Sequence, residues 1–293
     1  THTATHTATH TATHTATHCH TLPHTATHCH THCHTGYVPS IANNFCLVST
    51  VQTHVQPTTG TTTGTTTFAT LKIITGGCPA HRVHNNGVNH NGEKVNAAVY
   101  QQYTLEIPLL DVLAPPLLDP IPSFGGPVGV LLDGAFLYNP LTANGKDAVM
   151  AETFDHCFGQ ADELGRYHYH TTPLCLFELL NATHPPRSSW HHLRQLHNAS
   201  HHAAWLGSWP VTAKEPSPLL GWALDGVPIY GPYDETGTLL KWGGSVPNAM
   251  HPNVTSRLDA CNGRVRPTDG RYVYHLTPSS PYTVGCFRGG KGL

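Results

Sequence analysis

The sequence has little charge and no long apolar run. Only 11% of its 293 residues are charged, and the formal net charge is −2. No run of lysine or arginine offers the basic surface by which proteins hold nucleic acid, so we expect no nucleic-acid partner. No stretch approaches the roughly 18 apolar residues that a membrane-spanning helix needs, so we expect no membrane span.

The nine cysteines include no Cys-x-x-Cys pair, which excludes the common zinc-finger and thioredoxin motifs. The cysteines from Cys46 onward are even in number and suit three disulfides formed in an oxidising compartment. Acceptor patterns for N-glycosylation begin at Asn181, Asn198 and Asn253. Together these features predict a secreted, extracellular glycoprotein. Because the first residue is Thr1 rather than methionine, we expect a processed or partial chain.

Residues 1–36 repeat Thr-His-Thr-Ala and then change to His-Cys-His-Thr. A period of two gives an extended chain two distinct faces but gives a helix no coherent face, and threonine favours extended structure. A disordered linker is the alternative interpretation, since this tract has almost no apolar surface to bury. The threonines at odd positions are candidates for O-glycosylation: Thr1, Thr3, Thr5, Thr7, Thr9, Thr11, Thr13, Thr15 and Thr17.

An extended arm of this length would reach beyond its own domain. At about 3.3 Å per residue it spans roughly 120 Å, whereas a compact domain of about 255 residues is roughly 45–50 Å across. We therefore expect the arm to contact other copies of the chain. Its odd set of cysteines suits an interchain or arm-to-body bridge: Cys19, Cys29 and Cys33. Its alternating histidines could bind Zn or Cu, or stack against neighbours: His28, His30, His32 and His34.

The rest of the chain is predicted to be mainly β. Short apolar runs alternate with Asn-Gly turns, and helical periodicity is scarce. The best helical candidate, Ser189–Leu206, lies in what we interpret as a surface insertion. Three runs have the composition of strands: Thr67–Ile74, Tyr103–Ile107 and Val128–Leu132.

Two parts of the body resemble each other. Gly165–His170 has the sequence Gly-Arg-Tyr-His-Tyr-His and recurs as Gly270–His275, with Val273 in place of the first histidine. Asp-Gly turns at Asp133 and Asp225 precede the two copies in the same order. We predict an internally duplicated β-sandwich or barrel-like body with an extended N-terminal arm. The predicted domains are an arm, 1–36; a threonine-rich connecting segment, 37–77; and a body, 78–293, with halves at about 78–180 and 210–293 and an insertion at 181–209.

Four motifs together resemble the YHYH-domain proteins: GRYHYHTTP at 165–173, LDGVPIYGP at 224–232, LDACNGR at 258–264 and PYTVGCFRG at 281–289. The resemblance spans roughly residues 78–289 and does not include the arm. The family is usually extracellular and largely without an assigned activity, so the resemblance implies a fold more than a reaction. The sequence departs from the family pattern at Val273, where the second copy often has histidine. We expect disulfides Cys157–Cys175, Cys261–Cys286 and Cys46–Cys78.

The alternation of the strand places tyrosines and histidines on opposite faces. His168 and His170 would share one face, and His275 from a facing strand would complete a three-histidine site for Zn or Cu. Asp155 or Asp259 could add a further ligand. The alternative is a buried face on which the imidazoles bond to Asp155, Asp259 or turn backbone. The loss of a fourth histidine at Val273 weakens a closed four-histidine site but leaves a three-histidine site possible. We favour the structural interpretation.

Catalysis has little support in the sequence. Asp133 and Asp225 suggest a carboxylate pair for acid–base work, but aspartate in an Asp-Gly turn usually accepts backbone N–H groups. No Gly-x-Ser-x-Gly, phosphate-loop or dinucleotide motif is present, so we do not expect an enzyme. A weaker hypothesis is carbohydrate binding by exposed tryptophans of the insertion: Trp190, Trp205 and Trp209.

The leading hypothesis is a secreted structural glycoprotein that polymerises with copies of itself into a fibre. The arm would engage neighbouring subunits by strand addition or lateral docking. The alternative is a metal-binding module or metalloenzyme that uses His168, His170 and His275. The groups we expect to be attached are covalent glycans and, in the alternative, a divalent metal.

Overall fold

The computed structural model describes residues 52–57, 69–81, 83, 96–109, 119–120, 125–180, 182, 209–242 and 257–288. All of them belong to one compact unit, residues 34–293. The predicted arm, the helix at Ser189–Leu206 and the predicted glycosylation sites lie outside the described residues.

A three-stranded antiparallel sheet precedes the YHYH-like segments. Its order is β1-β2-β3, and its strands are β1 (Gln52–Pro57), β2 (Ala69–Thr75) and β3 (Tyr103–Leu109). Leu71 and Ile73 on β2 are buried while Lys72 between them is partly exposed, as a half-buried strand requires. The strands predicted at Thr67–Ile74 and Tyr103–Ile107 are thereby confirmed.

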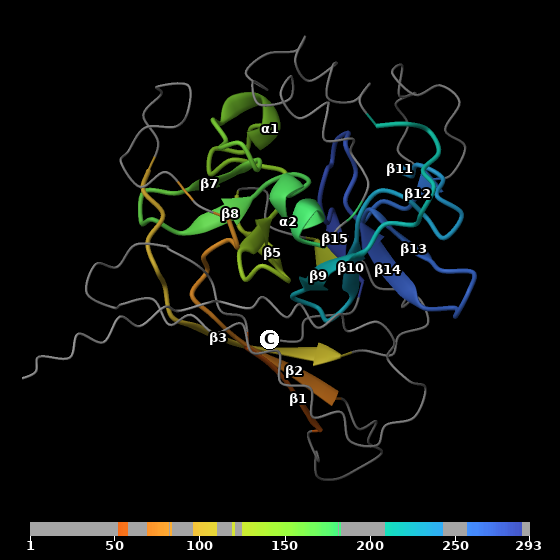
Figure 1. Cartoon of the computed structure of the whole chain (residues 1–293), viewed down its shortest axis with the longest axis horizontal. Helices are drawn as coiled ribbons and strands as arrows, with labels where there is room; N and C mark the ends of the chain where they lie inside the picture. The colour runs from red at the N-terminus through yellow and green to blue at the C-terminus, as the bar shows by residue number, and fades with distance from the viewer. Residues whose placement is uncertain are drawn as a thin grey trace, which may run out of the picture. The chain divides into compact units, whose positions relative to one another are not determined.

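A larger sheet of eight strands forms the body (Figure 1), with the order β13-β14-β10-β9-β5-β6-β8-β7. The run predicted at Val128–Leu132 corresponds to β5. The strands are β5 (Pro127–Leu131), β6 (Phe136–Tyr138), β7 (Gly159–Ala161), β8 (Tyr167–Tyr169), β9 (Leu219–Ala223), β10 (Pro228–Tyr230), β13 (Gly263–Val265) and β14 (Tyr272–His275).

The two sides of this sheet have the same order and directions. The central pair, β5 and β9, is antiparallel. On one side β6 pairs antiparallel with β5, β8 parallel with β6, and β7 antiparallel with β8. On the other side β10, β14 and β13 follow β9 in the same way. Each side carries one of the tyrosine-bearing strands, β8 or β14. The internal duplication of the sequence stays a prediction.

The two sheets pack face to face. Leu71, Ile73 and Ile107 of the smaller sheet form a buried cluster with Val130 of β5. Phe136 on β6 packs at the edge of this cluster and meets the Tyr103 ring edge-on at 4.8 Å. The prediction of a mainly β, sandwich-like body is therefore confirmed.

Two short helices were not predicted. The helix α1 (Ala148–Ala151) begins after Asp147, whose side chain accepts a hydrogen bond from the Met150 N–H at 3.2 Å. The helix α2 (Leu174–Leu179) follows β8. Two further strand pairs complete the body: β4 (Asp119–Pro120) with β15 (Cys286–Phe287), and β11 (Lys241–Trp242) with β12 (Arg257–Leu258). Within the described part of the chain no helix is long and apolar enough to cross a membrane.

Two predicted disulfides, Cys157–Cys175 and Cys261–Cys286, are present. Each joins the loop before one antiparallel hairpin, β7–β8 or β13–β14, to a segment that follows it. Cys78 is also disulfide-bonded, and its predicted partner Cys46 lies outside the described residues.

Two glycines sit directly against tyrosine rings. A Cβ added at Gly159 would collide with the Tyr167 hydroxyl, and one added at Gly263 would collide with the Tyr272 hydroxyl. Because interiors are close-packed, we expect Gly159→Ala to lower the free energy of unfolding by about 1–3 kcal/mol. Denaturant unfolding would measure the change. Gly126→Ala is the matched control, since nothing lies within 4 Å of its added Cβ, and equal losses in the two variants would contradict the steric explanation.

Candidate functional site in the tyrosine–histidine strands

The side chains of β8 alternate as the sequence predicts. The rings of Tyr167 and Tyr169 meet edge-on on one face, with centroids 5.3 Å apart. The rings of His168 and His170 meet edge-on on the other, with centroids 4.9 Å apart. The two faces therefore have separate chemistry.

The tyrosine face is a set of hydroxyl–carboxylate hydrogen bonds. The Tyr167 hydroxyl donates to Asp155 at 2.7 Å, and the Tyr169 hydroxyl donates to Asp133 at 2.9 Å. The second half repeats both bonds, from Tyr272 to Asp259 at 2.8 Å and from Tyr274 to Asp225 at 2.7 Å. The expectation that Asp155 and Asp259 bond the imidazoles of these strands is therefore wrong, because their carboxylates face the tyrosine side.

Asp133 and Asp225 also accept hydrogen bonds from the backbone N–H groups of their own turns. Asp133 accepts the Ala135 N–H at 3.1 Å, and Asp225 accepts the Val227 N–H at 3.2 Å. Burial raises the pKa of Asp133. Both carboxylates therefore stabilise the fold through these hydrogen bonds. This agrees with the turn interpretation and gives no support to a catalytic pair.

The histidine face of β8 has a defined tautomer. His168 Nδ1 lies 2.9 Å from the Arg166 carbonyl oxygen, and His170 Nδ1 lies 2.6 Å from the Asn139 carbonyl oxygen. A carbonyl only accepts, so each Nδ1 carries the proton and each Nε2 presents a lone pair. Burial lowers the pKa of His168 to about 4 and that of His170 to about 3. Both rings are therefore neutral near pH 7, and the backbone positions them as expected.

Glu152 and Gln160 complete this group. Glu152 follows α1, and its Oε2 lies 3.3 Å from His170 Nε2. The Gln160 side-chain amide on β7 donates to the same carboxylate, and its nitrogen lies 3.5 Å from His168 Nε2. One ligand atom each from Glu152, His168 and His170 lies within 4.8 Å of the others. Burial raises the pKa of Glu152.

The group is closed on the histidine side and open at the carboxylate. Tyr138 stacks on His168 with centroids 4.0 Å apart and meets His170 edge-on at 5.6 Å. Both histidines are 2% exposed, whereas the Glu152 side chain is 25% exposed. Glu152 is therefore the most solvent-exposed of these three side chains.

His275 occupies the corresponding place in the second half. Its Nδ1 lies 2.7 Å from the Gly231 carbonyl oxygen, and its Nε2 accepts from Arg264 Nε at 3.2 Å. Arg264 Nη2 also donates to Glu235 at 2.6 Å. Four strands separate β14 from β8 in the sheet, so the structure does not bring His275 to His168 and His170.

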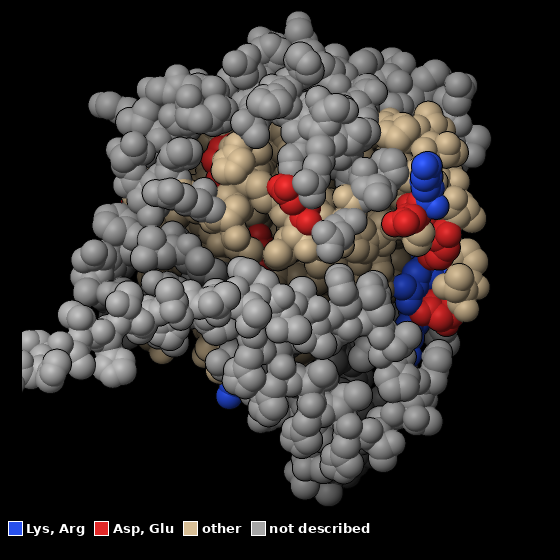
Figure 2. Space-filling model, in the orientation of Figure 1, with Lys and Arg blue, Asp and Glu red and all other residues tan. Residues whose placement is uncertain are grey.

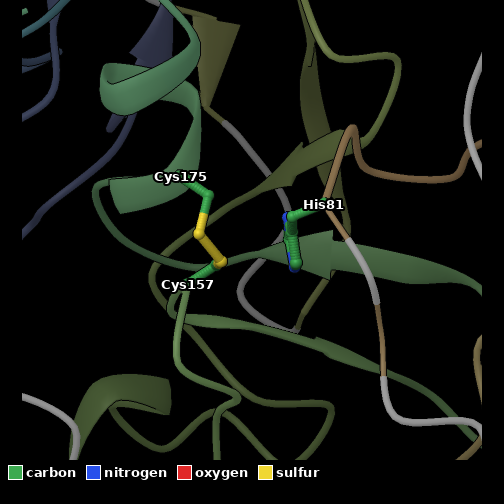
Figure 3. Close-up of side chains that lie close together, drawn as sticks. All are labelled: His81, Cys157 and Cys175. Atoms are coloured by element: carbon green, nitrogen blue, oxygen red, sulfur yellow. A yellow bond between two sulfur atoms is a disulfide. The ribbon is translucent and has the colours of Figure 1, made fainter.

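A second polar cluster lies beside the first disulfide and includes His81, which the sequence did not single out. His81 lies next to Cys157 and Cys175 (Figure 3), and its Nε2 is 3.1 Å from both Asp155 Oδ2 and the Tyr167 hydroxyl. His81 and Cys175 also line a cavity of about 240 Å³. No local pattern could have indicated these contacts, because 86 positions separate His81 from Tyr167.

Arginine takes the place of His81 in the second half. Arg288 Nη2 lies 3.7 Å from Asp259, and its guanidinium lies over the Tyr272 ring, 5.3 Å from the centroid. In Figure 2, basic side chains at the right of the view adjoin acidic ones, and the ion pairs of this half include Arg264–Glu235. In the second half, therefore, an arginine lies close to a carboxylate in both pairs: Arg288 with Asp259, and Arg264 with Glu235.

The carbohydrate hypothesis loses one of its three residues. Trp209 is 1% exposed and packs against Phe177 and Tyr233, so it cannot present its ring to a sugar. Trp190 and Trp205 lie outside the described residues.

The burial of His275 predicts a pH dependence of stability. Burial lowers its pKa from 6.5 to about 3, so between these values the unfolded chain binds a proton that the folded chain does not. The stability gained from the neutral ring is present above pH 6.5 and is lost as the pH falls toward 3.

We expect His275→Gln to reduce the slope of unfolding free energy against pH in this window, by up to about 1.4 kcal/mol per pH unit. Denaturant titrations at a series of pH values measure this slope. Val273→Ala, at a fully buried neighbour, should lower stability equally at every pH. An unchanged slope in His275→Gln would contradict the assignment.

Residues 120–245 match the family model described as YHYH protein. The match includes the GRYHYHTTP and LDGVPIYGP motifs, and it confirms the resemblance that they indicate. No curated protein and no solved structure matches the chain.

Proposed function

We propose that this chain, which contains a YHYH domain over residues 120–245, is a secreted structural glycoprotein subunit that polymerises into a fibre. The body described above would be the repeating unit, and residues 1–36 would engage neighbouring copies. A contact between an arm and a different surface of the next copy is head-to-tail and need not close, so it generates a filament.

The cross-linked body supports secretion. Cys157–Cys175 and Cys261–Cys286 each fasten one half of the large sheet, and Cys78 is disulfide-bonded as well. Disulfides persist in oxidising compartments and are rare in the cytosol. The N-glycosylation patterns at Asn181, Asn198 and Asn253 would also be used along a secretory route.

The observation that carries the proposal is the outer edge of β3. Among the described residues, this seven-residue strand pairs with β2 alone. Its side chains alternate, with Thr104 and Glu106 exposed and Ile107 buried. The backbone groups of such an edge are a template for another strand, and the two-residue period of the arm suits a strand with one face outward.

Deletion of residues 1–36 should abolish assembly. We expect the full chain from its native secretory route to form filaments in electron micrographs, and the deleted chain to form separate particles of normal secondary structure. The physical reason is that the body alone would lack the segment that reaches the next copy. Separate particles from the full chain, or filaments from the deleted chain, would contradict the proposal.

A proline variant distinguishes the two modes of arm contact. Ala8→Pro with Ala16→Pro keeps the length of the arm and all of its threonines but removes two backbone donors. Both lost N–H groups lie on the same edge of an extended arm, because positions 8 and 16 have the same parity. Strand addition through that edge predicts loss of filaments in this variant, whereas lateral docking predicts that they remain. Ala8→Ser with Ala16→Ser is the matched control and should assemble normally.

A further inference from the structure

The two halves of the large sheet differ in what lies between a histidine and a carboxylate. In the second half, the guanidinium of Arg264 lies between His275 Nε2, at 3.2 Å, and Glu235 Oε2, at 2.6 Å. One cationic side chain thus satisfies two acceptors at once.

The first half has the same acceptors without that cation. His170 is held by the Asn139 carbonyl as His275 is held by the Gly231 carbonyl, and its Nε2 faces Glu152 at 3.3 Å. The replacements occur at matched positions of the two hairpins. Gln160 is paired with His168 across β7 and β8, and Arg264 is paired with Val273 across β13 and β14.

Compared with the second half, the first half has the neutral amide of Gln160 in place of the Arg264 guanidinium. It also has a second imidazole, that of His168, in place of Val273. The lone pair of His170 Nε2 faces an oxygen of Glu152 at 3.3 Å, and neither atom can donate to the other while the carboxyl group is ionised. The Gln160 amide donates to Glu152 but carries no charge. Two acceptors that face each other in a mostly buried setting call for a cation between them.

We propose that the first half binds one divalent transition-metal ion of the Zn²⁺ class through His168 Nε2, His170 Nε2 and a carboxylate oxygen of Glu152, with water completing the coordination. This inference goes beyond the fibre function and does not depend on it. Imidazole and carboxylate are established zinc donors, and three protein ligands with an open position are common at zinc sites.

The surroundings suit this set of ligands. Each ligating imidazole would hold its other nitrogen on a backbone carbonyl, which is the usual way of fixing ring orientation at a metal. Tyr138 stacks on His168 and restricts its ring. The ligand atoms lie within 4.8 Å of one another, and those on one zinc ion lie about 3.3–4 Å apart. To bring all three together, the Glu152 side chain, which is a quarter exposed, would move with the Gln160 amide that donates to it.

The other groups with suitable side chains are weaker candidates. His81 with Cys157 and Cys175, and Asp155 with His156 and Cys157, each rely on cysteine sulfur. Cys157 and Cys175 are joined in a disulfide, so their sulfurs are not thiolate ligands. Among the groups found in the described residues, only Glu152, His168 and His170 offer three available donors.

The test measures Zn²⁺ binding to the full chain after removal of metals with a chelator. Calorimetric titration gives the stoichiometry, and Co²⁺ in place of Zn²⁺ gives a visible absorption spectrum that reports the ligands. Residues 1–36 are rich in histidine and are the same in every variant, so differences between variants isolate the proposed site.

Three variants should remove the site. Glu152→Gln deletes the carboxylate at nearly constant shape, His168→Val copies Val273, and Gln160→Arg copies Arg264. We expect each to weaken Zn²⁺ binding at the site by at least about 100-fold, since loss of a supporting contact alone costs 10–100-fold. Arg166→Gln is the matched control, because it changes an exposed charge beside His168, and it should keep the site.

The second half provides the converse test. Arg264→Gln combined with Val273→His should add a second equivalent of bound Zn²⁺, whereas Arg264→Gln alone should not. Circular dichroism and thermal unfolding establish that each variant is folded, and Glu152→Gln decides the question if the larger changes unfold the chain. Unchanged Zn²⁺ binding in Glu152→Gln would overturn the proposal. A proton shared between Glu152 and His170 would then explain why these two groups lie close together.

Discussion

The hydrogen bonds between buried tyrosines and carboxylates are the constraint on which the body depends. Asp133 is 4% exposed and Asp225 is 1% exposed, and a carboxyl group so buried is costly unless its oxygens are bonded. The Tyr169 and Tyr274 hydroxyls supply those bonds. Each of these hydrogen bonds joins an Asp-Gly turn of the central strands to β8 or β14, so it fixes the position of β8 or β14.

Placing the tyrosines decides the position of the histidines, because neighbouring residues of a strand point to opposite faces. The tyrosine faces of the two halves are nearly equivalent, and the histidine faces are not. The second half has Arg264 between its histidine and its carboxylate, while the first has Gln160 and a second histidine. One framework thus supports either an internal ion pair or the donor set that we assign to a metal.

Local patterns predicted much of the fold. The strands at Thr67–Ile74, Tyr103–Ile107 and Val128–Leu132 are present because period and composition are local properties. The helices α1 and α2 were missed, since segments of 4 and 6 residues are too short to show a helical period. Glu152 was missed for a different reason. It follows a short helix, and only the path of the chain carries it to the histidine face of β8.

The sequence by itself determined which side chains share a face of each tyrosine–histidine strand, because a strand has a period of two. It also indicated which cysteines pair around those strands. Only the tertiary structure decided what each face meets. Strand order places Asp155 against Tyr167 and Glu152 against His170, and it sets four strands between β8 and the strand of His275. These contacts join residues that do not belong to the same strand or helix, so no local period encodes them.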